Sequence, residues 1–179
     1  MGELNQVRHH AVLAHGLAVQ AIRARGKAGT KVGPAENINI AVPLIESAEH
    51  IQAAQNATRE ANAPFLTVIL EGKYTDAYLK EAGKDAPKFT DEDLKVIAAP
   101  LDFVGINVYK PDLTQLQRAT ADGVPVNGYF EWSRINNLEW MNGFGDRFGL
   151  VHVDFKTQKR TPKMSASWFR EAARRNAVV

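Results

Sequence analysis

Two tryptophans and a carboxylate lie close together in the last third of the chain. Trp132, Glu139 and Trp140 fall within nine positions, and Phe144 and Phe148 follow soon after. An aromatic ring can cover the flat C–H face of a sugar, and an ionised carboxylate can accept hydrogen bonds from two neighbouring hydroxyls. These residue types at this spacing therefore predict a carbohydrate site.

The same residues also have a purely structural interpretation. Large aromatic side chains are mostly buried in proteins, so both tryptophans could belong to a core. Glu139 would then be solvated, or paired with Arg134 or Arg147. Composition by itself favours this second interpretation.

Other clusters of chemically active residues carry less weight. His9, His10 and His15 could suggest a metal site, but histidines five positions apart fall on different sides of a helix and no carboxylate lies at ligand spacing. Basic residues near the C-terminus alternate with acids and apolar residues, which is typical of a solvated helix face. We therefore expect no metal, no cofactor and no nucleic acid.

The composition is that of an ordinary globular protein. The chain has 179 residues, 22 Lys plus Arg against 20 Asp plus Glu for a net charge of +2, 45% hydrophobic residues and no cysteine. The missing cysteine excludes disulfides and thiolate ligands and is compatible with a reducing compartment. No apolar run approaches the roughly 20 residues that cross a bilayer, and no signal peptide is visible. We expect a cytoplasmic protein without membrane contact.

Strands and helices are predicted to alternate along the chain. Helical periodicity covers 5–25 and 46–62; a short helix begins after Thr90 as N-cap, and the last helix begins at Thr161-Pro162. A further short helix could occupy 113–121. Predicted strands occupy 37–43, 101–109, 124–133 and 150–155. This order predicts an α/β fold with a mainly parallel sheet, in which chemistry collects after the carboxyl ends of strands.

The chain resembles a known family over nearly its whole length. From Gly128 it reads GYFEWSRINNLEWMNGFGDRFGLVHVDFKTQKRTPK, which resembles the C-terminal signature of family 1 glycoside hydrolases, the retaining β-glucosidases and their relatives. Residues 102–109 resemble the sixth strand of that family, which ends in Gly-x-Asn-Tyr-Tyr, and residues 9–16 resemble the helix after its fourth strand. The resemblance implies parts of a TIM (β/α)₈ barrel.

The resemblance also implies roles for four residues of the aromatic segment. Glu139 would bind the outer hydroxyls of the sugar, and Trp140 would reach a hydroxyl through its indole N–H. Trp132 would form the floor of the sugar pocket, and Phe148 would line the same subsite.

Two further site residues follow from the sixth-strand resemblance. Asn107 would lie near the reacting centre, and Tyr109 would hydrogen-bond the nucleophile. The chain departs from the family pattern at four positions: Val108, Arg134, Asn136 (usually Asp) and Leu138 (usually Phe).

The catalytic motifs of the family are missing from this sequence. Retaining glycosidases need two carboxyl groups about 5 Å apart, which the family carries in Asn-Glu-Pro and Glu-Asn-Gly motifs, and neither occurs here. Glu36, expected just before a strand, Glu71 and Glu131 are not suited to replace them. We therefore assign no catalytic residue.

A complete barrel typically needs about 250 residues, so residues 1–179 are predicted to form one partial barrel domain, with strands corresponding to the fifth, sixth and eighth of a truncated family member. The expected function is that of a β-glucosidase-like hydrolase acting on β-glucosides with retention, inactive as this chain alone. The alternative is a non-catalytic sugar-binding remnant, or a fragment that requires a complementary chain. Exposed barrel edges are expected to favour self-association.

Overall fold

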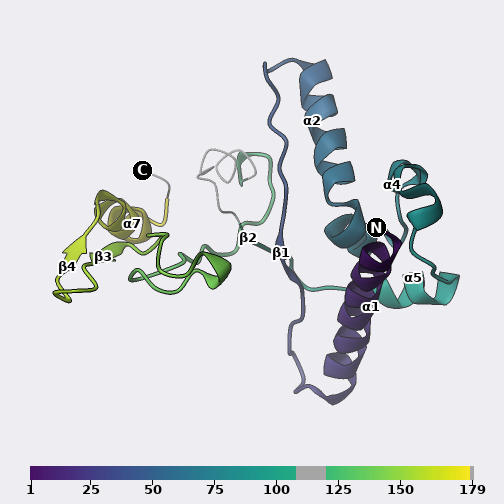
Figure 1. The fold of residues 1–179 in the computed structure, drawn as a ribbon, viewed down its shortest axis with the longest axis horizontal. Coiled ribbons are helices and arrows are strands. Elements are labelled where there is room, and N and C mark those ends of the chain that lie inside the picture. Colours follow the sequence, from purple (N-terminus) through teal and green to yellow (C-terminus); the bar gives the residue numbers. More distant parts are fainter. Residues whose placement is uncertain (108–119, 178–179) are drawn as a thin grey trace. The chain divides into compact units, whose positions relative to one another are not determined.

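The computed structural model describes residues 1–107 and 120–177 (Figure 1). The chain divides into two compact units, Met1–Tyr109 and Lys110–Val179. Unit 1 and unit 2 below mean the described parts of each. The prediction that residues 1–179 form one partial barrel domain stays a prediction.

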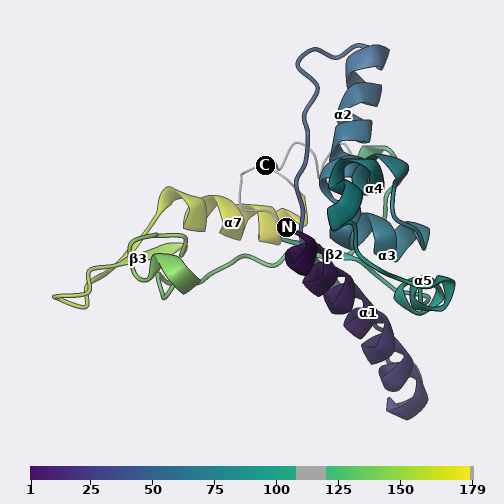
Figure 2. The same cartoon turned by 45° about the vertical axis from the view of Figure 1, so that its right-hand side comes forward.

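Helix α1, Gly2–Arg25, confirms the helix predicted over 5–25. It ends at Gly26, whose N–H donates to the carbonyl of Ile22 at 2.7 Å. Helix α5, Asp91–Ile97, lies against α1 (Figures 1 and 2) and begins at the predicted N-cap, where Thr90 and Asp93 form a reciprocal capping box. Gly16 is where the two helices meet, because a Cβ there would lie 2.1 Å from the carbonyl oxygen of Val96. The close approach of α1 and α5 therefore requires glycine at this position.

The rest of unit 1 is mostly helical. Helix α2, Ala48–Ala61, begins at Ser47 and confirms the second predicted helix. A π-helical turn, Ala63–Thr67, leads into α3, Val68–Glu71, and α4, Asp76–Ala82, is followed by the 3₁₀ turn Gly83–Asp85. The main core lies among α1, α3 and α5, and its fully buried members are Val12, Val68, Ile69, Tyr74 and Ile97.

The strands form two separate pairs. In unit 1, β1, Ala35–Asn37, runs parallel to β2, Gly105–Asn107, with Asn37 opposite Asn107. In unit 2, β3, Val151–Val153, pairs antiparallel with β4, Arg160–Pro162. The mainly parallel sheet that we expected is thus present as one pair, and the described residues contain no closed barrel. The strand predicted at 150–155 is confirmed in its central part.

Two of the other predicted strands are wrong in extent. The strand expected over 37–43 ends at Asn37, because the next backbone N–H groups bond to side chains of α2 instead of to a neighbouring strand: Asn39 N–H donates to Asn62 Oδ1 and Ala41 N–H to Thr58 Oγ1, both at 3.0 Å. The strand expected over 101–109 is limited to β2 among the described residues.

Two predictions in the second half of the chain are also wrong. The segment 124–133 belongs to no strand, since no partner strand pairs with it among the described residues. Thr161 and Pro162 do not open the last helix, because they pair with His152 and Val151 in β4. Helix α7 runs from Met164 to Arg175 and has Lys163 as N-cap. Of the short helix considered for 113–121, residues 113–119 lie outside the described residues.

Candidate functional site

The loop that carries the aromatic segment is held against β3 by backbone hydrogen bonds. Leu150 N–H donates to Ser133 carbonyl oxygen at 2.8 Å, and Val151 N–H donates to Arg134 carbonyl oxygen at 3.0 Å. Returning along the loop, Asn136 N–H donates to the Val151 carbonyl at 3.2 Å. The start of the loop is therefore fixed on a regular element.

Glu139 and Trp132 meet inside this loop. The indole Nε1–H of Trp132 donates to Glu139 Oε2 at 3.3 Å. Glu139 is only 8% exposed, whereas Trp132 is 58% exposed. A tight turn sets the carboxylate in place, since Glu139 N–H donates to Gly143 carbonyl oxygen at 2.7 Å. The arrangement puts a carboxylate underneath an open indole ring.

Trp140 and the phenylalanines complete an exposed aromatic surface in unit 2. Trp140 is 77% exposed and Phe148 is 45% exposed. Phe144 packs edge-to-face on Phe155, with ring centroids 5.2 Å apart, and the guanidinium of Arg147 stacks over the same ring at 4.3 Å. The tryptophans are thus not core residues, and Glu139 forms no ion pair with Arg147 among the printed contacts of the described residues, because Arg147 Nη1 donates to the Val153 carbonyl at 3.2 Å.

Sequence reasoning missed an unusual buried amide in the same loop. Asn136 is 3% exposed, and neither its Oδ1 nor its Nδ2 has a hydrogen-bond partner among the described residues. Gly149 packs directly on this backbone, where a Cβ would lie 2.3 Å from Asn136 N. The departure from the family pattern at position 136 was visible in the sequence, but its burial without a partner was not.

The remaining predicted site residues belong to unit 1. Asn107 closes β2 and stands in register with the exposed Asn37 at the carboxyl ends of two parallel strands. Tyr109 lies outside the described residues. Glu36 lies within β1 and not before a strand as predicted, because the strand begins earlier than expected. Burial raises the pKa of the Glu36 carboxyl above its ordinary value.

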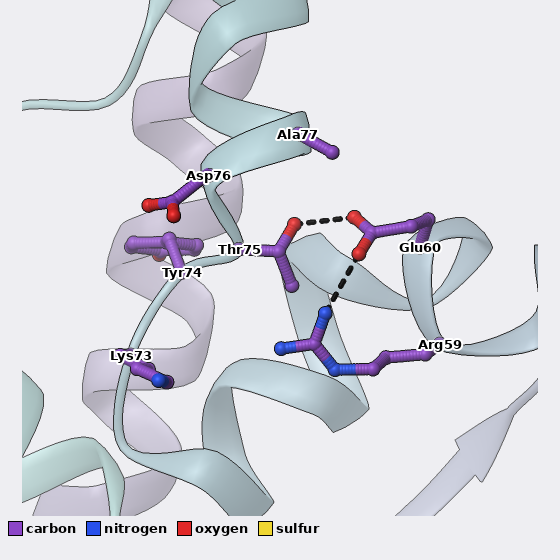
Figure 3. A pocket seen from close by; sticks show the side chains of 7 residues that line it. All are labelled: Arg59, Glu60, Lys73, Tyr74, Thr75, Asp76 and Ala77. Carbon is purple, nitrogen blue, oxygen red and sulfur yellow. Dashed lines mark hydrogen bonds and ion pairs between the residues drawn. The ribbon is translucent and has the colours of Figure 1, made fainter. Parts of the chain in front are cut away.

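A polar hollow near the end of α2 is the other candidate in unit 1, and Figure 3 shows its lining. Arg59 binds Glu71 with two hydrogen bonds of 2.5 Å and Glu60 with one of 2.7 Å, while Thr75 donates to the second oxygen of Glu60. The guanidinium holds the pKa of Glu71 below its ordinary value. Because these charges are already paired with one another, we interpret the cluster as a structural brace.

Two further searches cover the described residues only. They contain no group of three or more His, Asp or Glu side chains placed to hold a metal ion. None of the helices described here is both long and apolar enough to cross a membrane.

Comparison with known proteins agrees with this aromatic and acidic surface. The family model of glycosyl hydrolase family 1 matches residues 1–118 and 110–178. The chain therefore belongs to glycosyl hydrolase family 1.

Individual relatives extend this result. The chain is 26% identical to Beta-glucosidase 44 from Arabidopsis thaliana over 95% of its own length and 52% of the relative, and 44% identical to Beta-glucosidase 26 from Oryza sativa subsp. japonica over 51% of its own length and 17% of the relative. Its fold matches the structure of virulence factor SghA from Agrobacterium tumefaciens with a TM-score of 0.72 and 25% identity, over 93% of this chain and 55% of that chain. SghA has also been solved in complex with its substrate analog salicin. These structures are TIM barrels, which a partial barrel fits.

The chain spans about half the length of the curated relatives it matches. The match to Beta-glucosidase 44 extends over 268 positions, of which this chain can fill about 170, or 95% of 179. About 98 positions within the matched region are therefore occupied by the relative alone. An internal part of the relative has no counterpart in this chain.

Proposed function

We propose that this chain is a β-glucosidase-like sugar-binding part of a family 1 barrel, which binds β-glucosides and does not hydrolyse them on its own. Trp132, Glu139, Trp140 and Phe148 of unit 2 would form the sugar site, and Asn107 and Tyr109 would contribute to it as the family resemblance implies. The observation that carries the proposal is the hydrogen bond of 3.3 Å between Trp132 and the nearly buried Glu139.

The geometry of Glu139 suits the recognition of hydroxyl groups. Its Oε2 accepts the indole N–H of Trp132, while Oε1 accepts no hydrogen bond from the described residues. A carboxylate oxygen beneath an exposed ring can accept a charge-assisted hydrogen bond from a sugar whose C–H face covers the indole. This combination supports a polyhydroxylated ring as ligand.

Hydrolysis needs more than this site provides. Displacement with retention takes a nucleophilic carboxylate and a second carboxyl group that acts as acid and then as base, about 5 Å apart. Glu139 is a single acid, and the sequence contains neither of the motifs in which the family carries the catalytic pair. We infer that binding without turnover is the activity of this chain alone.

A second candidate is favoured by the internal gap in the alignments. About 98 positions of the relative inside the matched region have no counterpart here. If a separate polypeptide supplied them, hydrolysis of β-glucosides could be restored by mixing, and this outcome would identify a complementing fragment.

Tryptophan fluorescence during titration with methyl β-glucoside tests the proposal. We expect quenching without release of chromophore from an aryl β-glucoside. Glu139→Gln keeps an acceptor for Trp132 but loses the charge, so binding should weaken at least tenfold, because hydrogen bonds to charged groups contribute about 1.5–3 kcal/mol.

Trp168→Phe in α7 is the matched control, since it removes an indole outside the proposed site, and should bind with the affinity of the parent chain. Sorbitol, which has no ring, should cause no quenching. Turnover by the pure chain, or binding that Glu139→Gln leaves unchanged, contradicts the proposal.

A further inference from the structure

The segment Val124–Trp132 has an unpaired backbone. Among the described residues only one of its N–H groups is bonded, that of Val126, which donates to the Val124 carbonyl at 2.9 Å. The segment belongs to no ladder and carries one charged residue, Glu131, near its end. A row of free backbone groups with so little charge is the kind of edge to which another strand adds.

One face of this segment is apolar and exposed. Side chains alternate between the two faces of an extended chain, so Gly128 lies at the centre of a face whose exposed fractions are 52%, 40%, 95% and 58% for, in order, Val124, Val126, Phe130 and Trp132. The opposite face is used inside unit 2. Tyr129 donates to Glu131 Oε2 at 2.7 Å, and its ring lies 6.0 Å from that of Phe169 in α7.

The order of residues on the exposed face is the same in kind from either end. In an antiparallel pair of two identical segments centred on Gly128, Val126 lies opposite Phe130 and Val124 lies opposite Trp132. Aromatic residues opposite β-branched residues are favourable cross-strand pairs. On the other face Glu131 lies opposite Pro125, so no like charges meet. The face is therefore self-complementary.

The single proline fits the same register. When the two Gly128 residues form a hydrogen-bonded pair, positions 126 and 130 also exchange hydrogen bonds, and 125 falls at a non-hydrogen-bonded position. The missing N–H of Pro125 then costs no ladder bond, as expected for proline in a paired strand.

From these observations we infer that two copies of this chain associate by antiparallel pairing of residues 124–132 about a twofold axis at Gly128. A second copy is the occupant that a self-complementary pattern fits, and the resulting interface closes at two chains. The 98 positions that this chain lacks relative to Beta-glucosidase 44 are consistent with a segment that has lost neighbouring strands. The inference does not rest on sugar binding, although the ring of Trp132 would be shared by the two interfaces.

Cross-linking through one introduced thiol tests the axis directly. The chain has no cysteine, so Gly128→Cys reports only its own pairing, and a Cβ at this position makes ordinary contacts with Phe130. Under mild oxidation we expect a disulfide-linked dimer at protein concentrations at which Lys156→Cys, a control on the exposed turn after β3, stays monomeric. Equal cross-linking of both variants, or of neither, overturns the proposed axis.

Sedimentation of the cysteine-free chain tests the association independently. We expect twice the chain mass of 19.8 kDa, with at least tenfold weaker association for Phe130→Glu, which places a carboxylate opposite Val126 of the other copy. Met141→Glu is the control, because Met141 is 100% exposed and lies outside the segment. A parent chain that sediments as a monomer, or a Phe130→Glu dimer as tight as the control, contradicts the inference.

Discussion

Unit 1 buries its apolar side chains against one another, whereas unit 2 presents them at its surface. Nine of the ten buried hydrophobic residues belong to residues 1–107, and Val153 is the one that belongs to residues 120–177. Phe130, Trp132 and Trp140 of unit 2 are all more than half exposed. Because burial of apolar area is the main source of stability, unit 1 is equipped as a self-contained scaffold and unit 2 as a surface for a ligand or another chain.

The largest effect expected from this difference is in the core of unit 1. Ile97 is 0% exposed and packs with Val12 and Val68, so Ile97→Ala should lower the free energy of unfolding by about 2–5 kcal/mol through lost burial and a cavity. Urea unfolding followed by circular dichroism measures the change. Leu70→Ala, at a position 57% exposed, should change it by less than about 0.5 kcal/mol; similar losses in both variants would show that the core assignment is wrong.

A smaller effect compares two buried asparagines. Asn62 accepts from Asn39 N–H at 3.0 Å and donates to the Asn39 carbonyl at 2.8 Å, whereas Asn136 has no partner among the described residues. Asn62→Leu should cost about 2 kcal/mol, because it leaves the backbone groups of Asn39 unpaired. Asn136→Leu should be neutral or slightly stabilising.

Urea unfolding of both leucine variants provides the measurement, and each serves as the control for the other. A large loss of stability in Asn136→Leu would mean that its amide is satisfied in solution, and the contrast between the units would then disappear.

The features predicted correctly from the sequence are those that local residues determine. The Thr90 cap depends on Asp93, three positions away, and helix α1 depends on its own apolar stripe. Family membership follows in the same way from a continuous motif, which the family model matches.

The incorrect predictions involve contacts between distant residues. The periodicity of 124–133 indicated an extended chain but could not supply a partner strand, and Thr161-Pro162 carried a helix-start signal that pairing with β3 overrides. Asn39 and Ala41 bond to α2 side chains about 20 positions away. At the candidate site, residue types indicated Glu139 and the tryptophans, but the burial of Glu139 and Asn136 depends on tertiary packing.

The smallest effect that we predict concerns pH and tests whether the core of unit 1 contains a titrating group. His9 is 2% exposed, with Nδ1 3.0 Å from the Tyr74 hydroxyl and Nε2 3.8 Å from Asp93 Oδ2. Burial lowers the pKa of His9 below its ordinary value, His10 lowers it further, and the Asp93 carboxylate opposes part of this shift. Burial also lowers the pKa of His15.

The direction of the pH dependence follows from these shifts. The unfolded chain takes up protons on both histidines near pH 6.5, whereas the folded chain does so only at lower pH. The unfolded state therefore binds more protons in this range, and stability should fall as pH decreases from about 7.5 through 6.5. Urea midpoints measured at several pH values should show a weaker dependence for His9→Gln than for the parent chain. Val12→Ala, which destabilises the same helix without removing an imidazole, should keep the parent slope; if His9→Gln keeps it as well, His9 is not the titrating group, and the core of unit 1 is stabilised by packing alone.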